Sequence, residues 1–218
     1  ADKNARLLTH EHYEQLNGIR GVITARAEEV IAKHPMQAHA FFEYFVGLNN
    51  ENKPYAKSVN TDEVQKENEA LYSLIQAFID AQLVVDCSTE TEKRVKLAHD
   101  TLLNFDNNDS SWTALKDWFE ESHEYLQWLN TTSGDFKRWL TLEKRQENTN
   151  DEKVDSPSGT FLLNDHDLSL GLGFQQQNSI QQPKVRGYIA QSQKYKEALL
   201  KQKNRKQRLV ILLVSVFL

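Results

Sequence analysis

Apolar residues recur at intervals of three and four along much of the chain, a spacing that predicts helices. The first complete stripe covers residues 19–31, and it ends before His34-Pro35 because the residue before a proline avoids the helical conformation. Ahead of this stripe, Thr9 is expected to cap a short helix that ends at Asn17-Gly18.

Two more helices are predicted before residue 83. One covers residues 36–48, with its phenylalanines turned inward, and a polar, turn-rich segment follows it up to Ser58. The other covers residues 61–82 behind Asn60, which with Glu63 resembles a capping box.

The hydrophobic period then changes from helical to alternating. Residues 83–85 are short and β-branched, 88–93 form a polar turn, and 94–98 alternate as a half-buried strand does. Another helix is expected to start near His99. Two helices followed by a β-hairpin is the order of elements in a winged-helix domain, so the pattern predicts a mainly α fold with one hairpin.

The second half of the chain is predicted to be helical around a linker. Tryptophan and leucine residues at helical spacing cover 112–129 and are interpreted as packing core. Residues 143–159 are charged and contain little to bury, which favours a linker. A short apolar segment, 161–174, and a basic helix, 188–208, follow.

The net charge of −5 conceals two regions of opposite sign. Residues 184–208 hold nine Lys or Arg and one Glu, a charge of +8, which leaves −13 for the rest. Ten uncharged residues, 209–218, come next, whereas a membrane-spanning helix needs about 20 apolar residues. Because the tail ends without a polar stop and the chain opens on Ala1 with no apolar leader, we expect a fragment of a longer protein without a secretory signal.

Composition adds two constraints. Eight Gly and four Pro are few for 218 residues, which agrees with a mainly helical fold. Cys87 is alone and forms no internal disulfide, as is typical of the reducing cytosol, so a cytoplasmic location is expected, with membrane association through the apolar C-terminal segment as an addition.

The sequence offers little chemistry of its own. His10 and His12 lack the further ligands that a metal site needs, and the adjacent pairs Glu28-Glu29 and Glu120-Glu121 diverge on helix surfaces. No phosphate-binding loop, dinucleotide fingerprint or nucleophile elbow occurs. We therefore expect no catalytic residue, no metal and no enzymatic activity in this chain.

Charge disfavours DNA binding by the predicted winged helix. The helix over 61–82, which would read DNA, carries five acidic residues and one Lys, a net charge of −4 that phosphates would repel. The basic run at 184–208 is better explained by the apolar stretch beside it, as a cytoplasmic flank or a solvated helix face. No nucleic acid is expected as a partner.

His99 differs from the other histidines because it stands where the alternating strand turns into a helix, directly before Asp100. A histidine packed at the end of a strand is one reading of this position. The other comes from a family resemblance that extends over nearly the whole chain.

Five segments carry that resemblance. The first, LTHEHYEQLNGIRGV at 8–22 with RAEEV at 26–30, resembles the stretch after the ATPase core of bacterial STAND-type, NACHT-like NTPases that often carry WD-repeat propellers. The segments LIQAFIDAQLVV at 74–85 and VKLAHDTLL at 95–103 are similar to two motifs of that family, although Gln82 stands where the family commonly has Arg. The helices at 112–139 resemble its helical arm, and the basic and apolar run at 188–218 resembles its junction before the propeller.

The resemblance implies a nucleotide-dependent switch. In it, His99 would face the phosphates of bound nucleotide and hold the ADP-bound closed state, and Asp100 would orient His99 or cap the next helix. ATP or ADP with Mg²⁺ would belong to a nucleotide-binding domain outside this chain, whose partners would be that domain, C-terminal sensor repeats and other copies of the protein in a homo-oligomer. The function implied is signal transduction or bacterial defence.

The resemblance also suggests a division of the chain. Residues 1–35 would end the ATPase lid, 36–104 form the winged helix, 105–208 form the helical arm, and 209–218 start an apolar connector. Two other functions stay open: a membrane-anchored helical adaptor with membrane contact through 184–218, and a winged-helix DNA-binding regulator.

Overall fold

The computed structural model describes residues 18–105, 112–148 and 161–216. The chain divides into two compact units, residues 1–127 and residues 128–218, and the boundary falls inside the long helix α6 (Thr113–Asn148). Helices dominate both units, and the strands form small antiparallel sheets, which confirms the mainly α fold with a β-hairpin. The helix expected behind Thr9 lies outside the described residues.

The first unit opens with helix α2 (Gly18–Lys33), which ends before His34-Pro35 as predicted. A short 3-10 turn, η1 (Pro35–Gln37), leads into helix α3 (Ala38–Phe45). The predicted helix over 36–48 is wrong at its C-terminal end, because Val46–Leu48 is a strand, β1.

Strand β1 forms a hairpin with β2 (Pro54–Ala56), which lies in the polar, turn-rich segment that follows. The side chain of Asn49 closes the turn, since its Oδ1 accepts hydrogen bonds from the backbone N–H groups of Glu51 and Lys53, both at 2.9 Å. On the strand, a Cβ at Gly47 would lie 2.8 Å from Cε1 of Tyr55, so a larger residue at this position would force the Tyr55 ring to shift.

The predicted helix over 61–82 is two helices, α4 (Thr61–Glu67) and α5 (Glu69–Asp80). Asn68 separates them with extended backbone angles, and its side chain accepts a hydrogen bond from the N–H of Leu71 at 3.0 Å. Asn60 caps α4 in the same way by accepting from the N–H of Glu63 at 3.0 Å, which confirms the predicted cap.

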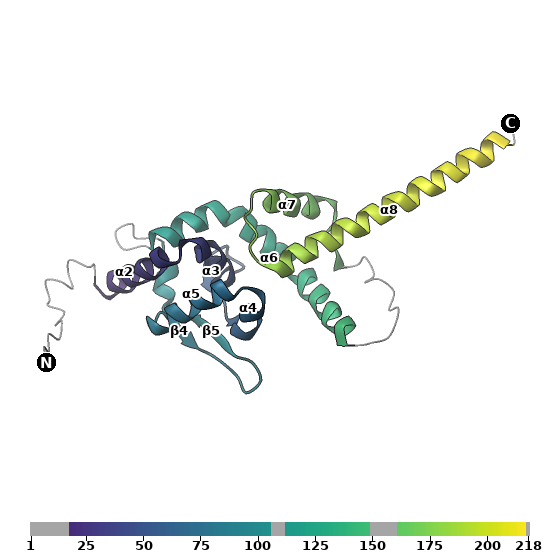
Figure 1. The fold of residues 1–218 in the computed structure, drawn as a ribbon. Coiled ribbons are helices and arrows are strands. Elements are labelled where there is room, and N and C mark those ends of the chain that lie inside the picture. The colour runs from purple at the N-terminus through teal and green to yellow at the C-terminus, as the bar shows by residue number, and fades with distance from the viewer. Residues whose placement is uncertain (1–17, 106–111, 149–160, 217–218) are drawn as a thin grey trace, which may run out of the picture. The chain divides into compact units, whose positions relative to one another are not determined.

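A three-stranded antiparallel sheet follows the order β3-β5-β4, with β3 (Val59–Asn60), β4 (Val84–Asp86) and β5 (Arg94–Leu97). The β4–β5 hairpin is the one predicted from alternation, and α3, α4 and α5 are grouped with it (Figure 1). The N–H of Leu83 bonds to the carbonyl of Phe78 at 2.9 Å around Gln82, whose φ of 59° closes α5 and starts β4.

Aromatic side chains form the core of the first unit. The ring of Phe41 stacks on Phe45 and Phe78, with centroids 4.3 and 4.2 Å apart. Trp112, just before α6, contacts Phe42 at 5.1 Å and Phe78 at 5.8 Å. All five side chains are at most 1% exposed, so the tryptophan-rich segment does supply packing core.

The second unit contains the C-terminal part of α6, helix α7 (Asp165–Gln176) and helix α8 (Pro183–Val216). Helix α6 continues to Asn148, so the first six residues of the predicted linker at 143–159 are helical, and 149–160 lie outside the described residues. The basic helix predicted at 188–208 is confirmed, and it extends further in both directions.

Two large side chains anchor this unit. Trp128 of α6 donates from Nε1 to the carbonyl of Asp167 at 2.9 Å, and Tyr188 of α8 donates from its hydroxyl to the carbonyl of Phe161 at 2.7 Å. The ring of Tyr188 also lies 5.3 Å from that of Trp139. Each anchor therefore buries an apolar ring while satisfying its polar atom.

Two glycines of α7 provide a matched test of this packing. A Cβ at Gly171 would lie 2.8 Å from Cζ2 of Trp128, whereas a Cβ at Gly173 would meet nothing within 4 Å. We expect Gly171→Ala to destabilise the protein by about 1–3 kcal/mol, because the Trp128 ring must shift. Gly173→Ala should be neutral or stabilising by up to about 1 kcal/mol, because alanine favours helix. Urea unfolding of both variants measures the difference, and equal effects would contradict the packing described.

Candidate functional site

His99, the residue singled out by the sequence, lies at the junction between β5 and the 3-10 turn η2 (Asp100–Leu103). The N–H of Ala98 donates to the carbonyl of Leu83 at 2.8 Å, and the carbonyl of His99 accepts from the N–H of Leu102 at 3.1 Å. The His99 side chain is exposed, so it is not packed at the end of the strand. The Asp100 side chain lies outside the described residues, and its pairing with His99 stays a prediction.

Buried leucines hold this junction on both sides. Leu97 is 1% exposed, and Leu102 and Leu103 are 2% and 5% exposed. An exposed imidazole thus stands between two stretches of backbone that the core fixes. A ligand that contacts the imidazole would therefore need to order the side chain of His99 but not its backbone.

Helix α2 reaches the end of the same junction through Arg20. Its Nη2 donates to the carbonyl of Asn104, directly after η2, while its Nε is buried without a hydrogen-bond partner among the described residues. No periodicity or motif in the sequence marks Arg20 as a functional residue. Its one signal is its place within the first of the resembling segments, between Gly18 and Gly21.

A second polar group is buried on helix α3. Glu43 of α3 has no exposed surface, and its Oε1 accepts a hydrogen bond from the hydroxyl of Tyr125 on α6 at 2.5 Å. Lys57 donates from Nζ to the backbone carbonyl of Glu43, also at 2.5 Å. Burial lowers the pKa of Lys57 to about 8, although the nearby Glu43 carboxylate opposes that shift.

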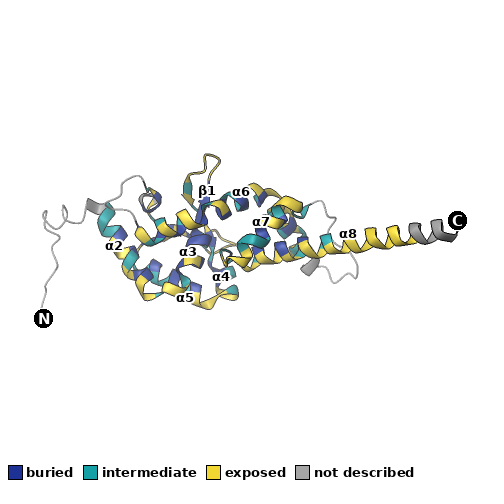
Figure 2. Cartoon of the chain, turned by 90° about the horizontal axis from the view of Figure 1, so that it is seen from above, coloured by how far each residue is buried: buried dark blue, intermediate teal, exposed yellow. Residues whose placement is uncertain are grey.

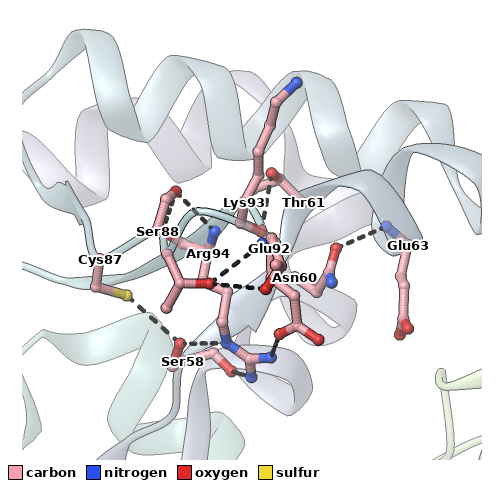
Figure 3. Close-up of polar contacts among 11 residues, drawn as sticks. Ser58, Asn60, Thr61, Glu63, Cys87, Ser88, Glu92, Lys93 and Arg94 are labelled. Carbon is pink, nitrogen blue, oxygen red and sulfur yellow. Dashed lines mark hydrogen bonds and ion pairs between the residues drawn. The ribbon is translucent and has the colours of Figure 1, made fainter.

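A polar network also joins β3, β4 and β5 (Figure 3). Arg94 donates from Nε to Oγ of Ser58 at 2.9 Å and from Nη1 to Glu92 at 2.8 Å, and the thiol of Cys87 lies 3.4 Å from the same Oγ. The two contacts of Ser58 link the hairpin to the segment that leads into β3, and the contact between Arg94 and Glu92 lies within the hairpin. The network therefore stabilises the sheet, and we assign no chemistry to the free thiol of Cys87 within it.

The described residues hold no group of three or more His, Cys, Asp or Glu side chains placed to bind a metal ion. In α4 and α5, the acidic side chains Asp62, Glu69 and Asp80 are exposed beside a single exposed cation, Lys66. This surface is therefore negative where a DNA reader would need positive charge.

The basic half of α8 is exposed, as Figure 2 shows. Leu199 and Leu200 are about half exposed, and the basic residues from Lys201 to Arg208 surround the helix. Within the part of the chain that the structure describes, no helix is both long and apolar enough to span a membrane.

Comparison with known proteins gives one match. Residues 1–147 match the family model described as Novel STAND NTPase 1. A search of curated proteins and a search of solved structures each found no match. The match includes α2, both sheets, the His99 junction and all of α6 except Asn148.

The lowered pKa of Lys57 predicts a pH dependence of stability. Unfolded, Lys57 titrates near 10.5, and folded near 8, so between these values the unfolded chain binds more protons. The free energy of unfolding should therefore rise from pH 8 to pH 10.5 more in the wild type than in Lys57→Met. Urea unfolding across this range measures it, with Lys53→Met as an exposed control that keeps the wild-type slope. A Lys57→Met slope equal to that of the wild type would contradict the burial of this ammonium.

Proposed function

The chain belongs to the Novel STAND NTPase 1 family, and we propose that it is the regulatory segment of such an NTPase, coupling the state of a bound nucleotide to a sensor and to oligomerisation. The single observation that carries the proposal is an exposed His99 on a backbone fixed from both sides, within the matched residues. Signalling or bacterial defence would be the process served.

The winged-helix part of the proposal is supported by the order of elements in the first unit. Strand β3, helices α4 and α5, and the β4–β5 hairpin follow one another, and β3 pairs with β5 at the edge opposite β4. We take residues 36–104 as this domain and 1–35 as the end of the ATPase lid before it. Residues 105–208 would be the helical arm that leads to the sensor repeats.

His99 would act as the phosphate-sensing residue of the switch. An imidazole N–H beside a diphosphate gains a charge-assisted hydrogen bond, and a protonated imidazole adds attraction between opposite charges. Nucleotide shifts a two-state equilibrium only through contacts that differ between the states. Because the backbone around His99 is held by buried leucines, a movement of this domain would carry the imidazole with it and break the contact.

The chemistry of ATP would belong to another part of the protein. A phosphate-binding loop supplies backbone N–H groups and a Lys to the phosphates, and no such motif occurs in the 218 residues. Mg²⁺, bound with the nucleotide, would neutralise phosphate charge there. The segment proposed here contributes His99 and, in the same motif, Asp100.

A second candidate is a helical adaptor at a membrane, which the exposed basic half of α8 favours. Lys201, Lys203, Arg205, Lys206 and Arg208 fall within eight residues without an acid, and such runs are attracted to anionic lipid. Sedimentation with phosphatidylserine vesicles would distinguish the two. Salt-sensitive binding to the vesicles that is lost when these five cations are replaced supports the adaptor. Binding of the chain to its nucleotide-binding domain in the absence of lipid supports the switch.

The switch predicts that His99→Ala weakens ADP retention in the protein that includes the nucleotide-binding domain. The lost bond is charge-assisted and worth about 1.5–3 kcal/mol, so ADP should dissociate roughly tenfold faster or more. Stopped-flow release of fluorescent ADP measures the rate, and light scattering measures the accompanying shift to larger oligomers.

His39→Ala is the matched control, because His39 is an exposed histidine of α3 in the same unit. It should leave both the ADP release rate and the oligomer size unchanged. If His99→Ala also changed neither quantity, the assignment of His99 as the sensing residue would be wrong.

The 218-residue chain alone is expected to show no ATP turnover, because it contains no phosphate-binding loop. A phosphate-release assay with the purified chain measures this. Turnover above background that disappears in His99→Ala would show a catalytic role for this residue and would refute the regulatory proposal.

A further inference from the structure

A pocket of about 580 Å³ lies between the β1–β2 hairpin and the segment after β5. Its lining includes Lys53 and Tyr55 from the hairpin, Lys96 from β5, and Leu103, Asn104 and Phe105 at and after η2. This volume is in the range of small-molecule sites, which are about 300–1,000 Å³. His99 is not among the lining residues, and nothing proposed above uses this pocket.

Two aromatic rings of the pocket are braced from behind. The ring of Tyr55 lies over Gly47 on the paired strand, so close that a Cβ there would be 2.8 Å from Cε1. Tyr55 is nevertheless 46% exposed. The ring of Phe105 lies 5.1 Å from that of Phe119 on α6. Both rings are thus supported apolar surfaces on which a flat ligand can pack.

The charge of the pocket is positive and only partly compensated. Lys53 pairs with Glu51 at 3.0 Å, but both side chains are about 70% exposed, so water screens this pair. Lys96 has no ion pair among the described residues. The guanidinium of Arg20 is a third positive charge, and it lies at the lining residue Asn104. Its only hydrogen bond among the described residues is to the Asn104 carbonyl. No acidic side chain is among the described lining residues.

We infer that this pocket binds a small aromatic anion. The aryl ring would pack against Tyr55 and Phe105, with a phosphate or carboxylate group at the ammonium groups of Lys96 and Lys53. Apolar contact supplies affinity, and the ammonium groups select for the negative charge. Phosphate and carboxylate share this chemistry, and the test separates them.

The test is an amide NMR titration of the 218-residue chain with four probes. 1-Naphthyl phosphate and 2-naphthoate carry a ring and a charge, 2-naphthol carries the ring alone, and inorganic phosphate carries the charge alone. The two aromatic anions should bind at least about tenfold tighter than the other two, because one charge-assisted hydrogen bond is worth about 1.4 kcal/mol or more. The tighter of the two anions identifies the group that the site prefers.

The largest amide shifts should fall on residues 53, 55, 56, 96 and 103–105. Lys96→Met should weaken both aromatic anions at least about tenfold and leave 2-naphthol unchanged, while Tyr55→Leu should weaken all three aromatic probes. Lys66→Met, an exposed Lys of α4 outside the pocket, is the matched control and should change nothing. A thermal melt of each variant confirms that it folds.

Three results would overturn the inference. The first is a set of shifts that fall on the basic residues of α8 and leave the pocket unchanged. The second is equal binding of 2-naphthol and the aromatic anions. The third is an equal loss of affinity in Lys96→Met and Lys66→Met, which would show general attraction to positive charge.

Discussion

The geometry of this protein's candidate site depends on the burial of leucines on both sides of one exposed residue. Leu97, Leu102 and Leu103 are each at most 5% exposed, and each fully buried leucine stabilises the fold by about 1.5–3 kcal/mol. Between them, the carbonyl of His99 accepts the hydrogen bond that starts η2. The core therefore fixes the backbone of a residue whose side chain does not itself enter the core.

The same core depends on residues that are distant in sequence. Phe41 and Phe78 stack from α3 and α5, and Trp112 covers Phe78 from the segment before α6. Thirteen residues later, Tyr125 reaches the buried carboxylate of Glu43. Truncating one partner of such a buried pair leaves a polar group unsatisfied, which costs about 1–3 kcal/mol. Helix α6 is thus part of the body that presents His99, and it continues into the second unit.

Local patterns predicted the elements whose signals lie within a few residues. The alternation at 94–98, the cap at Asn60 and the stop before Pro35 all appear in the structure. Where a predicted element differs from the structure, the cause is an interaction that the hydrophobic pattern does not show. Asn68 interrupts a continuous apolar stripe because its side chain competes for a backbone N–H, and such competition leaves the hydrophobic period intact.

Pairing across the chain explains the remaining differences. The pattern of Val46–Leu48 is typical of the end of a helix, but the segment is a strand because it pairs with Pro54–Ala56. Strand β3 is only two residues long, and its pairing with β5 defines it. The exposure of His99 and the links made by Arg20 and Glu43 likewise depend on tertiary contacts. The motif around His99 can therefore be found in the sequence, whereas the tertiary contacts that hold its backbone cannot.

The central claim is that nucleotide state is sensed at the junction between β5 and η2. Hydrogen–deuterium exchange of the protein that includes its nucleotide-binding domain, with and without ADP, tests it most directly. ADP should slow exchange of the amides at 98–103, including the N–H of Leu102 that bonds to His99. If ADP protected the nucleotide-binding domain but left exchange at 98–103 unchanged, the claim would be contradicted.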